Sequence, residues 1–517
     1  MIQGKRGARH FVPFGDDDAR LHACVTPTLD ARAYVVRQKN LDGRLVFRRS
    51  ARMTSTASTA ENPVPETNPS TVEAPPVRWS LARRILFRFV FAHFVILFFP
   101  TPFTGMLPVI GDAIDEFISD SIWLPVVRNV GKYVLRLPEE VTHVRSGSGD
   151  TTYDWVFLFT SVCLAVIVAA IWSYVQRRKD NHEKLDDYFR IWLRYTLATV
   201  MIGYGIVKLV KLQFGDPHIL QLVKTYGESS PMDLLWTFMG FSTPYTFFGG
   251  FMEFVPALML FFRRTTLLGN LLLMGVLGNV VMLNFCYDVP VKIHSSHLFF
   301  MTLVIALPDM KRLFQFFVQN APTQAVPERK KFAKPWMERG RVVAKVLFIV
   351  IVLGQQSYST WRGLKANPSE ATAPPILGVY EVTAFTRNGV DVPPSITDKT
   401  RWRYFLLSEY RDKQHVLITT MTGNKKFVSA KLDAQQKSIL LEEPNGDQGF
   451  ALPPQLTEGK GSFPMTLRFT EQEGRLHVLE GTIDGAAVRM ELKKLHKKDF
   501  LLINRGFHWV NEFPFSP

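Results

Sequence analysis

Cysteine is scarce in this sequence. The 517 residues hold three, Cys24, Cys163 and Cys286, and they form no CxxC or Cys/His spacing typical of a metal site. A disulfide framework and a cysteine-bound metal are therefore excluded as the basis of the fold. From about Ala373 onward there is no cysteine, so that segment must be stable without disulfides. Three cysteines are too few to indicate whether the protein works in an oxidising or a reducing compartment.

Motifs for nucleotide, haem or hydrolase chemistry are also missing. No GxGxxG, GxxxxGK[ST], HExxH, CxxCH or GxSxG occurs. The net charge is +15, but the basic residues cluster in short segments beside apolar runs, without an Arg-rich tail or RNA-binding signature. Nucleic acid is therefore not expected as a partner.

Charge is nearly absent from several windows that are long enough to cross a lipid bilayer as a helix, which takes about 17 to 25 residues. Aromatic residues make up 13% of the chain, with 41 Phe. The mean hydropathy of +0.04 is an average over long apolar segments and polar ones. We expect an α-helical multi-pass membrane bundle of about seven spans. Pro308 and Asp309 interrupt the sixth, and the seventh is barely long enough. The spans are Arg83–Pro100, Asp154–Val175, Phe189–Phe214, Tyr245–Phe262, Thr265–Cys286, Pro290–Phe317 and Val342–Tyr358.

A shorter helix is expected between the third and fourth spans, in "SSPMDLLWTFMG". Ser230 is a capping hydroxyl, Pro231 suits the first helical position and Asp233 the third, while Gly240 is a plausible stop. Ten residues give about 15 Å of helix, half a bilayer. This helix is expected to be interfacial or re-entrant.

Lysine and arginine predict the orientation of the spans. With seven spans, every strongly basic loop falls on one side, which the positive-inside rule places in the cytoplasm. The N-terminus is then cytoplasmic and the C-terminus lies on the exported side of the cell (inner) membrane. The basic residues that decide this are Arg78, Arg83, Arg84, Arg177, Arg178, Lys179, Lys184, Arg190, Arg263, Arg264, Lys311, Arg312, Arg329, Lys330, Lys331, Lys334, Arg339 and Arg341.

Four regions follow from these patterns. Residues 1–77 include a Ser-, Thr- and Pro-rich stretch from Met53 and are expected to be a disordered extension. Either Met1 or Met53 is a possible start. Residues 78–360 form the transmembrane domain, 361–372 a linker and 373–517 an exported β-domain.

The last region contains short alternating runs separated by turn signals such as "RNG", "PNGD" and "DGAA". Eight to ten strands in about 145 residues predict an all-β antiparallel barrel or sandwich. The opening "GVYEV" with its meander weakly resembles a lipocalin-type barrel. The alternative is a plain β-domain with a packed interior.

Glu253 is the most informative polar residue of the spans. It lies about 15 Å along the helix from Arg263, near the bilayer midplane, where a carboxylate must be protonated, paired or in a wet cavity. Gly249 and Gly250 allow close helix contact, and Pro256 can open the backbone beside it.

The third span offers partners for that carboxylate. Arg194, Tyr204, Lys208 and Lys211 fall within one arc of about 100° on the helix. Two hypotheses stay open for Lys208: it snorkels, or it pairs with Glu253. Asn270, Asn279 and Asn284 of the fifth span either join helices by hydrogen bonds or belong to the same polar site.

A polar island, "NFCYDVPVKIHSSH", separates the fifth and sixth spans. It is either a structural turn or the outer rim of a small-molecule site, and its His and Asp spacing matches no established metal motif. The candidate rim consists of Tyr287, Asp288, Lys292, His294 and His297. Because Cys286 is alone, a dithiol relay would need a partner protein.

Residues 189–317 resemble the DoxX-like family of integral membrane proteins. The features that carry the resemblance are "WLRYTLATVMIGYGIVKLVKLQF" and "YTFFGGFMEFVPALMLFFRRTTLLGNLLLMGVLGNVV". The resemblance implies a four-helix membrane bundle with Arg194, Gly205, Lys208 and Glu253 at the family's motif positions. It also implies thiosulfate:quinone oxidoreduction or another redox process, with a quinone as cofactor and a redox partner protein. This chain adds the first, second and seventh spans and the β-domain.

Three functions remain as hypotheses. The first, implied by the resemblance alone, is a redox-associated or quinone-interacting membrane subunit. The second is a proton-coupled small-molecule carrier that uses Glu253 and Lys208. The third is a non-enzymatic ligand-binding or assembly protein that acts through its β-domain.

Overall fold

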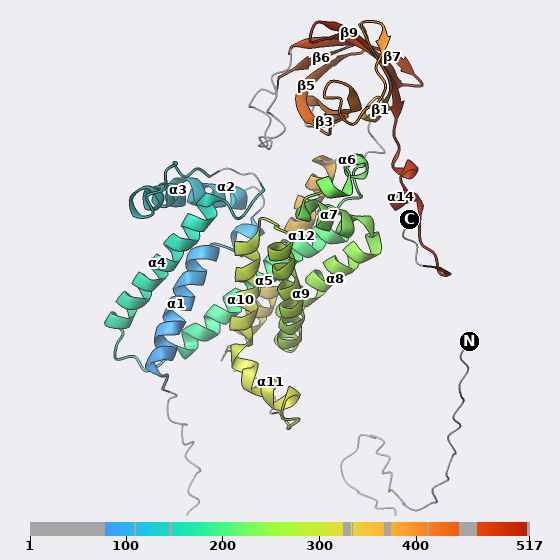
Figure 1. The fold of residues 1–517 in the computed structure, drawn as a ribbon. Helices are drawn as coiled ribbons and strands as arrows, with labels where there is room; N and C mark the ends of the chain where they lie inside the picture. Colours follow the sequence, from blue (N-terminus) through green and yellow to red (C-terminus); the bar gives the residue numbers. More distant parts are fainter. Residues whose placement is uncertain are drawn as a thin grey trace, which may run out of the picture. The chain divides into compact units, whose positions relative to one another are not determined.

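The computed structural model describes residues 78–107, 110–143, 147–323, 332, 334–366, 374–410, 413–443 and 463–513. These residues form a helical region and a β-barrel (Figure 1). The predicted N-terminal extension lies outside the described residues.

In the helical region, each predicted apolar segment forms a helix, and further helices are present between them. Residues 110–134, for which the sequence analysis predicted no element, are helical and include two π-helical segments, Ile118–Trp123 and Val130–Val134. The α-helices are α1 (Leu81–Phe98), α2 (Ile110–Phe117), α3 (Leu124–Asn129), α4 (Thr152–Val175), α5 (Glu183–Leu209), α6 (Ile219–Val223), α7 (Pro231–Phe241), α8 (Thr243–Leu260), α9 (Thr266–Cys286), α10 (Lys292–Ala306), α11 (Met310–Phe317) and α12 (Pro335–Ala366).

Among the described residues, four helical segments are long and apolar enough to cross a membrane. They are Thr152–Val175, Thr266–Cys286, Lys292–Phe317 and Pro335–Lys365. Together they indicate a multi-pass membrane protein. The three other predicted spans also form helices, α1, α5 and α8, but fall outside this set, so seven spans stay a prediction.

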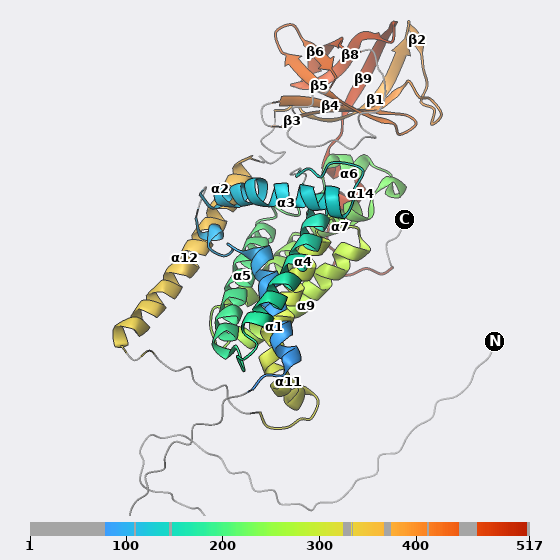
Figure 2. The same cartoon turned by 90° about the vertical axis from the view of Figure 1, so that its left-hand side faces the viewer.

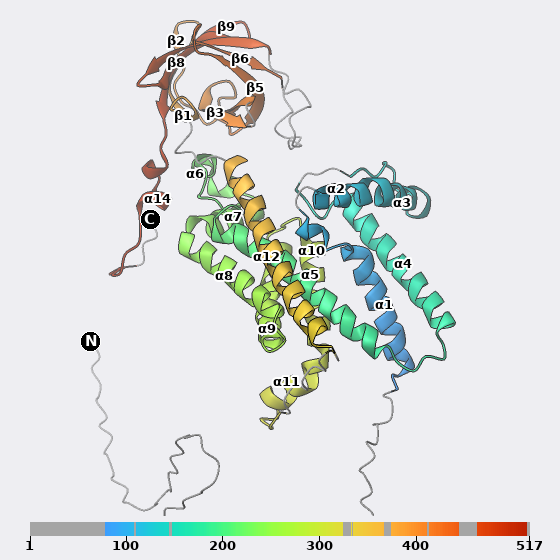
Figure 3. The ribbon, with the colours of Figure 1, turned by 180° about the vertical axis from the view of Figure 1, so that it is seen from behind.

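Aromatic and aliphatic side chains join these helices. Helix α1 packs along α4 (Figure 2), and the rings of Phe91 and Trp172 lie 5.6 Å apart. Helix α12 packs on α5 (Figure 3), and the rings of Phe348 and Tyr195 lie 5.0 Å apart. The helical core contains the fully buried Leu193, Leu197, Met201, Ile202, Leu260, Leu273 and Leu298.

The predicted short helix is present as α7. The Ser230 hydroxyl accepts a hydrogen bond from the Asp233 backbone N–H at 3.1 Å, and Pro231 occupies the first turn, as the capping pattern predicts. Helix α12 continues to Ala366, so the linker predicted at 361–372 begins as helix.

The C-terminal region is a closed antiparallel barrel, which decides between the predicted barrel and sandwich (Figure 1). Neighbouring strands pair in the order β1-β3-β4-β5-β6-β7-β8-β9, β9 pairs with β1, and the short β2 pairs only with β1. The strands are β1 (Gly378–Arg387), β2 (Val390–Asp391), β3 (Trp402–Tyr410), β4 (Lys413–Thr420), β5 (Lys425–Asp433), β6 (Ser438–Glu442), β7 (Met465–Gln472), β8 (Arg475–Ile483) and β9 (Ala486–Lys494).

Tight turns join several of these strands. Glu473 and Gly474, like Asp484 and Gly485, both have positive φ, the conformation of a two-residue turn whose twist matches that of the flanking strands. The turn signal in "DGAA" therefore predicted a real hairpin, and "EQEGR" forms a second one.

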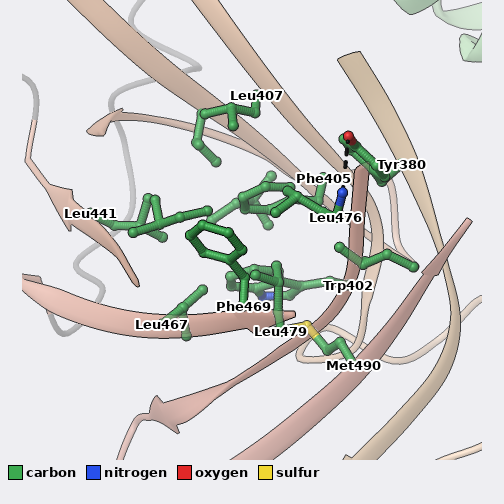
Figure 4. Packing of buried hydrophobic residues seen from close by; sticks show 14 of the residues in the cluster. Tyr380, Trp402, Phe405, Leu407, Leu441, Leu467, Phe469, Leu476, Leu479 and Met490 are labelled. Carbon is green, nitrogen blue, oxygen red and sulfur yellow. Dashed lines mark hydrogen bonds between the residues drawn. The ribbon is translucent and has the colours of Figure 1, made fainter. Parts of the chain in front are cut away.

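The barrel interior is filled by apolar side chains. Along β9, buried and exposed residues alternate, so every second side chain points inward. Figure 4 shows Phe405, Phe469 and Leu479 packed together inside the barrel. The Tyr380 hydroxyl donates to the Ile376 carbonyl at 2.7 Å, and burial raises the pKa of Tyr380 to about 12. These contacts favour the packed interior over a ligand-holding barrel.

Candidate functional site

Two glycines bring α5 and α8 into backbone contact. A Cβ on Gly250 would lie 2.8 Å from the Gly205 carbonyl oxygen, and one on Gly205 would lie 2.8 Å from the Phe254 Cβ. Only glycine lets the helices approach this closely. Gly250 therefore has the predicted role, whereas a Cβ on Gly249 would meet only Met239 at 3.9 Å.

The close approach places Lys208 of α5 against Glu253 of α8. The Lys208 Nζ donates to Glu253 Oε1 at 2.7 Å and to Oε2 at 2.6 Å. Lys208 is 7% exposed and Glu253 is 3% exposed. The predicted pair is thus present, and neither charge is left alone in the helical core.

Aromatic rings surround the ammonium group of this pair. The Lys208 Nζ lies 5.5 Å from the centroid of Tyr204 and 5.9 Å from that of Phe214, within reach of a cation–π attraction. The Tyr204 centroid is in turn 6.2 Å from that of His294 on α10. One residue of the predicted outer rim therefore lies beside the predicted intramembrane site.

His297, one turn along α10, is joined to α1. Its Nδ1 is 2.7 Å from the Ile293 carbonyl, so Nδ1 carries the proton and Nε2 accepts. The His93 Nε2 lies 3.2 Å from this Nε2 and must donate, which leaves the buried His93 Nδ1 as an acceptor without a partner. His93 was missed by the sequence analysis because no local pattern links residues 204 positions apart.

The structure places the other predicted site residues elsewhere. Arg194 donates to the Leu260 carbonyl through Nε at 3.1 Å and Nη2 at 2.6 Å, at the opposite end of the α5–α8 contact. Lys211 donates to the Gly240 carbonyl at 2.9 Å. Asn284 donates to the Ser295 hydroxyl at 2.9 Å and so joins α9 to α10, whereas Asn279 is exposed.

Part of the polar island is a structural turn. Lys292 forms an ion pair with Asp288 at 2.9 Å. The carboxylate of Asp150, far back in the sequence, accepts hydrogen bonds from the backbone N–H groups of Lys292 at 2.8 Å and Ile293 at 3.0 Å. Asp150 thus caps α10, a role that the sequence analysis missed because a cap from a distant loop has no local signature.

Tyr287 and Cys286 line a shallow groove of about 220 Å³ against the start of α7. Tyr226, Ser230 and Leu234 also line it, and it does not include Lys208 or Glu253. Among the described residues, no group of three or more His, Cys, Asp or Glu side chains is arranged to hold a metal ion.

One curated protein resembles part of this chain. Over 145 residues the chain is 31% identical to the uncharacterized protein YwoB of Bacillus subtilis (strain 168), covering 28% of this chain and 88% of YwoB. No protein-family model matches the chain, so the DoxX-like resemblance is not confirmed. No solved structure matches it either.

Proposed function

The chain belongs to the same family as YwoB, and we propose from its own geometry that it is a redox-associated membrane subunit. In this proposal, Lys208 and Glu253 exchange protons beside a bound quinone-type molecule. The observation that carries the proposal is the buried contact between these two side chains.

The pair suits proton exchange in a membrane. A proton passed from the Lys208 ammonium to the Glu253 carboxylate converts two charges into two neutral groups without changing the net charge. A buried pair therefore avoids the isolated charge that is so costly in hydrocarbon. Quinone reduction takes up protons together with electrons, so a site of this kind needs such groups close by.

Tyr204 and His294 extend the pair toward α10. Both side chains have hydrogen-bonding atoms that match the oxygen atoms of a quinone, and their ring centroids are 6.2 Å apart. Gly205, Lys208 and Glu253, three of the four positions of the DoxX-like resemblance, lie together at one end of the α5–α8 contact, and Arg194 lies at the other end. The grouping of Lys208, Glu253, Tyr204 and His294 supports a quinone as ligand, with the electrons supplied by a redox partner protein.

Mass spectrometry of small molecules retained by the gently solubilised protein tests the proposal. We expect a quinone in the wild type and its loss from Glu253→Gln and Lys208→Met. The exposed Asn279→Ala variant is the matched control and should retain it. A wild type that retains no quinone, even after quinone is supplied in proteoliposomes, contradicts the proposal.

The His93–His297 contact favours a second candidate, a proton-coupled carrier in which these histidines lead protons toward Glu253 and Lys208. Proton-dependent substrate flux into liposomes would support it.

For the third hypothesis, the filled barrel favours an assembly role over ligand binding. In either case we propose the orientation derived from the basic loops, with the N-terminus cytoplasmic and the barrel exported.

A further inference from the structure

We propose that the start of α1 and the loop between α4 and α5 form a binding site for an anionic phosphate group. Four residues make up this site, here named the donor cluster: Trp79, Arg84, Arg88 and His182. The site is separate from Lys208 and Glu253 and does not depend on the proposed redox function.

Arg88 supplies a buried positive charge that no carboxylate among the described residues neutralises. It is 1% exposed, its Nε and Nη2 donate to His182 Nε2 at 3.1 and 3.0 Å, and Nη2 also donates to the Gln176 carbonyl at 3.2 Å. In the part of the chain that the structure describes, no carboxylate pairs with it. A buried guanidinium is normally paired, because an uncompensated charge in the interior is costly.

His182 is a neutral acceptor on one side and a donor on the other. Because Arg88 can only donate, His182 Nε2 accepts and the ring proton lies on Nδ1. Burial, reinforced by the charges of Arg88, Lys179 and Arg84, lowers the pKa of His182 to about 4 and keeps the ring neutral. The Nδ1–H group is buried without a hydrogen-bond partner, and the side chain is 3% exposed.

Two more buried N–H groups lack an acceptor nearby. The Trp79 ring lies 6.2 Å from that of His182, and its Nε1–H is unpartnered, as is the Nε–H of Arg84. The backbone fixes both residues, since Trp79 N–H donates to the Asp180 carbonyl and Arg84 Nη1 to the Lys179 carbonyl. All three unpartnered groups are donors, so a ligand that satisfies them must offer acceptor atoms.

The surrounding charges make that acceptor an anion. Two acids close to His182 in the sequence already have partners, Asp180 with Arg78 at 3.6 Å and Asp186 with Arg190. The Arg83 guanidinium lies over the Trp79 ring at 4.2 Å and adds a further positive charge. A phosphate, with several acceptor oxygens and a negative charge, satisfies these donors. Free phosphate and the headgroup of an anionic lipid share this chemistry.

The test measures the melting temperature of the full-length protein in neutral detergent with added inorganic phosphate, against chloride at equal ionic strength. A second arm compares nanodiscs of zwitterionic lipid with nanodiscs that contain an anionic phospholipid. We expect a higher melting temperature with the anion. A rise in both arms identifies free phosphate as a sufficient ligand, and a rise with the lipid alone identifies the headgroup.

Trp79→Phe keeps an aromatic ring against Phe87 and deletes the unpartnered N–H. We expect an unchanged or higher melting temperature without anion, and anion binding at least about tenfold weaker, since a hydrogen bond to a charged group is lost. Trp172→Phe is the matched control because the Trp172 N–H is already satisfied by Gln176 Oε1 at 2.9 Å. It should lower the basal melting temperature and leave the response to anion unchanged.

The proposal is overturned if neither anion raises the melting temperature of the wild type, or if Trp79→Phe responds as strongly as the wild type. If Trp79→Phe does not fold, Arg84→Met, at a less buried position, replaces it with the same expectation.

Discussion

At the scale of single residues, Lys208 and Glu253 are predicted to be energetically coupled. Glu253→Gln leaves the Lys208 ammonium alone, and Lys208→Met leaves the carboxylate alone. An unpaired charge at the centre of a membrane helix costs about 2.5–3.5 kcal/mol on insertion scales. Each single change should therefore lower the melting temperature in detergent.

The double variant Lys208→Met/Glu253→Gln completes the cycle. It should recover much of the loss, because no buried charge is then unpaired. Additive losses in the double variant would show that the two side chains are not coupled.

His415 is predicted to make the stability of the barrel depend on pH. The side chain is buried on β4 and stacks on Phe427 with ring centroids 5.1 Å apart, and burial lowers its pKa below the usual value of about 6.5. Below that pH the unfolded chain binds a proton that the folded chain does not. The free energy of unfolding should therefore fall as the pH drops below about 6.5.

The variant His415→Phe isolates this contribution, because it keeps a ring at the position and removes the titrating group. Denaturant midpoints measured from pH 8 to pH 5 should fall more steeply for the wild type than for the variant. Parallel curves for the two proteins would rule out His415 as the source.

At the scale of helices, the approach of α5 to α8 depends on Gly250. The Cβ of Gly250→Ala would lie 2.8 Å from two backbone atoms, the Gly205 oxygen and the Leu209 nitrogen, so a helix must move. Overpacking of this kind costs about 1–3 kcal/mol. We expect a lower melting temperature in detergent and weaker coupling between Lys208 and Glu253.

Gly249→Ala is the control on the neighbouring position, where the nearest atom is 3.9 Å away. It should melt close to the wild type. Equal destabilisation by both substitutions would point to helix propensity or lipid contact as the cause, and would refute the close-contact explanation.

The barrel is predicted to fold without the helices. Its ring of strands closes through the β1–β9 pairing and surrounds a core cluster of its own. A fragment from Ala373 to Pro517 should be soluble, β-rich by circular dichroism and cooperative on melting. A coil spectrum would show that the barrel depends on the rest of the chain.

At the scale of the whole molecule, the predicted topology places the two chain ends on opposite sides of the membrane. A reporter active only in the exported compartment should work after Pro517 and fail near Glu328. The same response at both positions would mean that the seventh span, between them, does not cross.

The apolar helices and the alternating strands could be predicted because each follows a local rule. Membrane-length runs predicted α4, α9 and α12, and period-two patterns with turn residues predicted the barrel strands. The helical segment at 110–134 was missed, since its acidic and basic residues interrupt any membrane-length apolar run.

The candidate site could be predicted only in part. The helical periodicity placed Tyr204 and Lys208 on one face, and the cost of a buried carboxylate made Lys208 a partner for Glu253. Asn279 shares a helix with Asn284 and yet is exposed, because the packing of α9 against its neighbours decides which side chains turn inward.

The positions of helices and strands follow from the order of the amino acids, because hydrophobic period and turn chemistry act over a few residues. Which distant groups meet depends on the folded arrangement: Asp150 meets the start of α10, His93 meets His297, and Arg88 meets His182. These contacts join residues 142, 204 and 94 positions apart. They depend on how helices pack, and packing is set by the summed shape of many side chains rather than by any short motif.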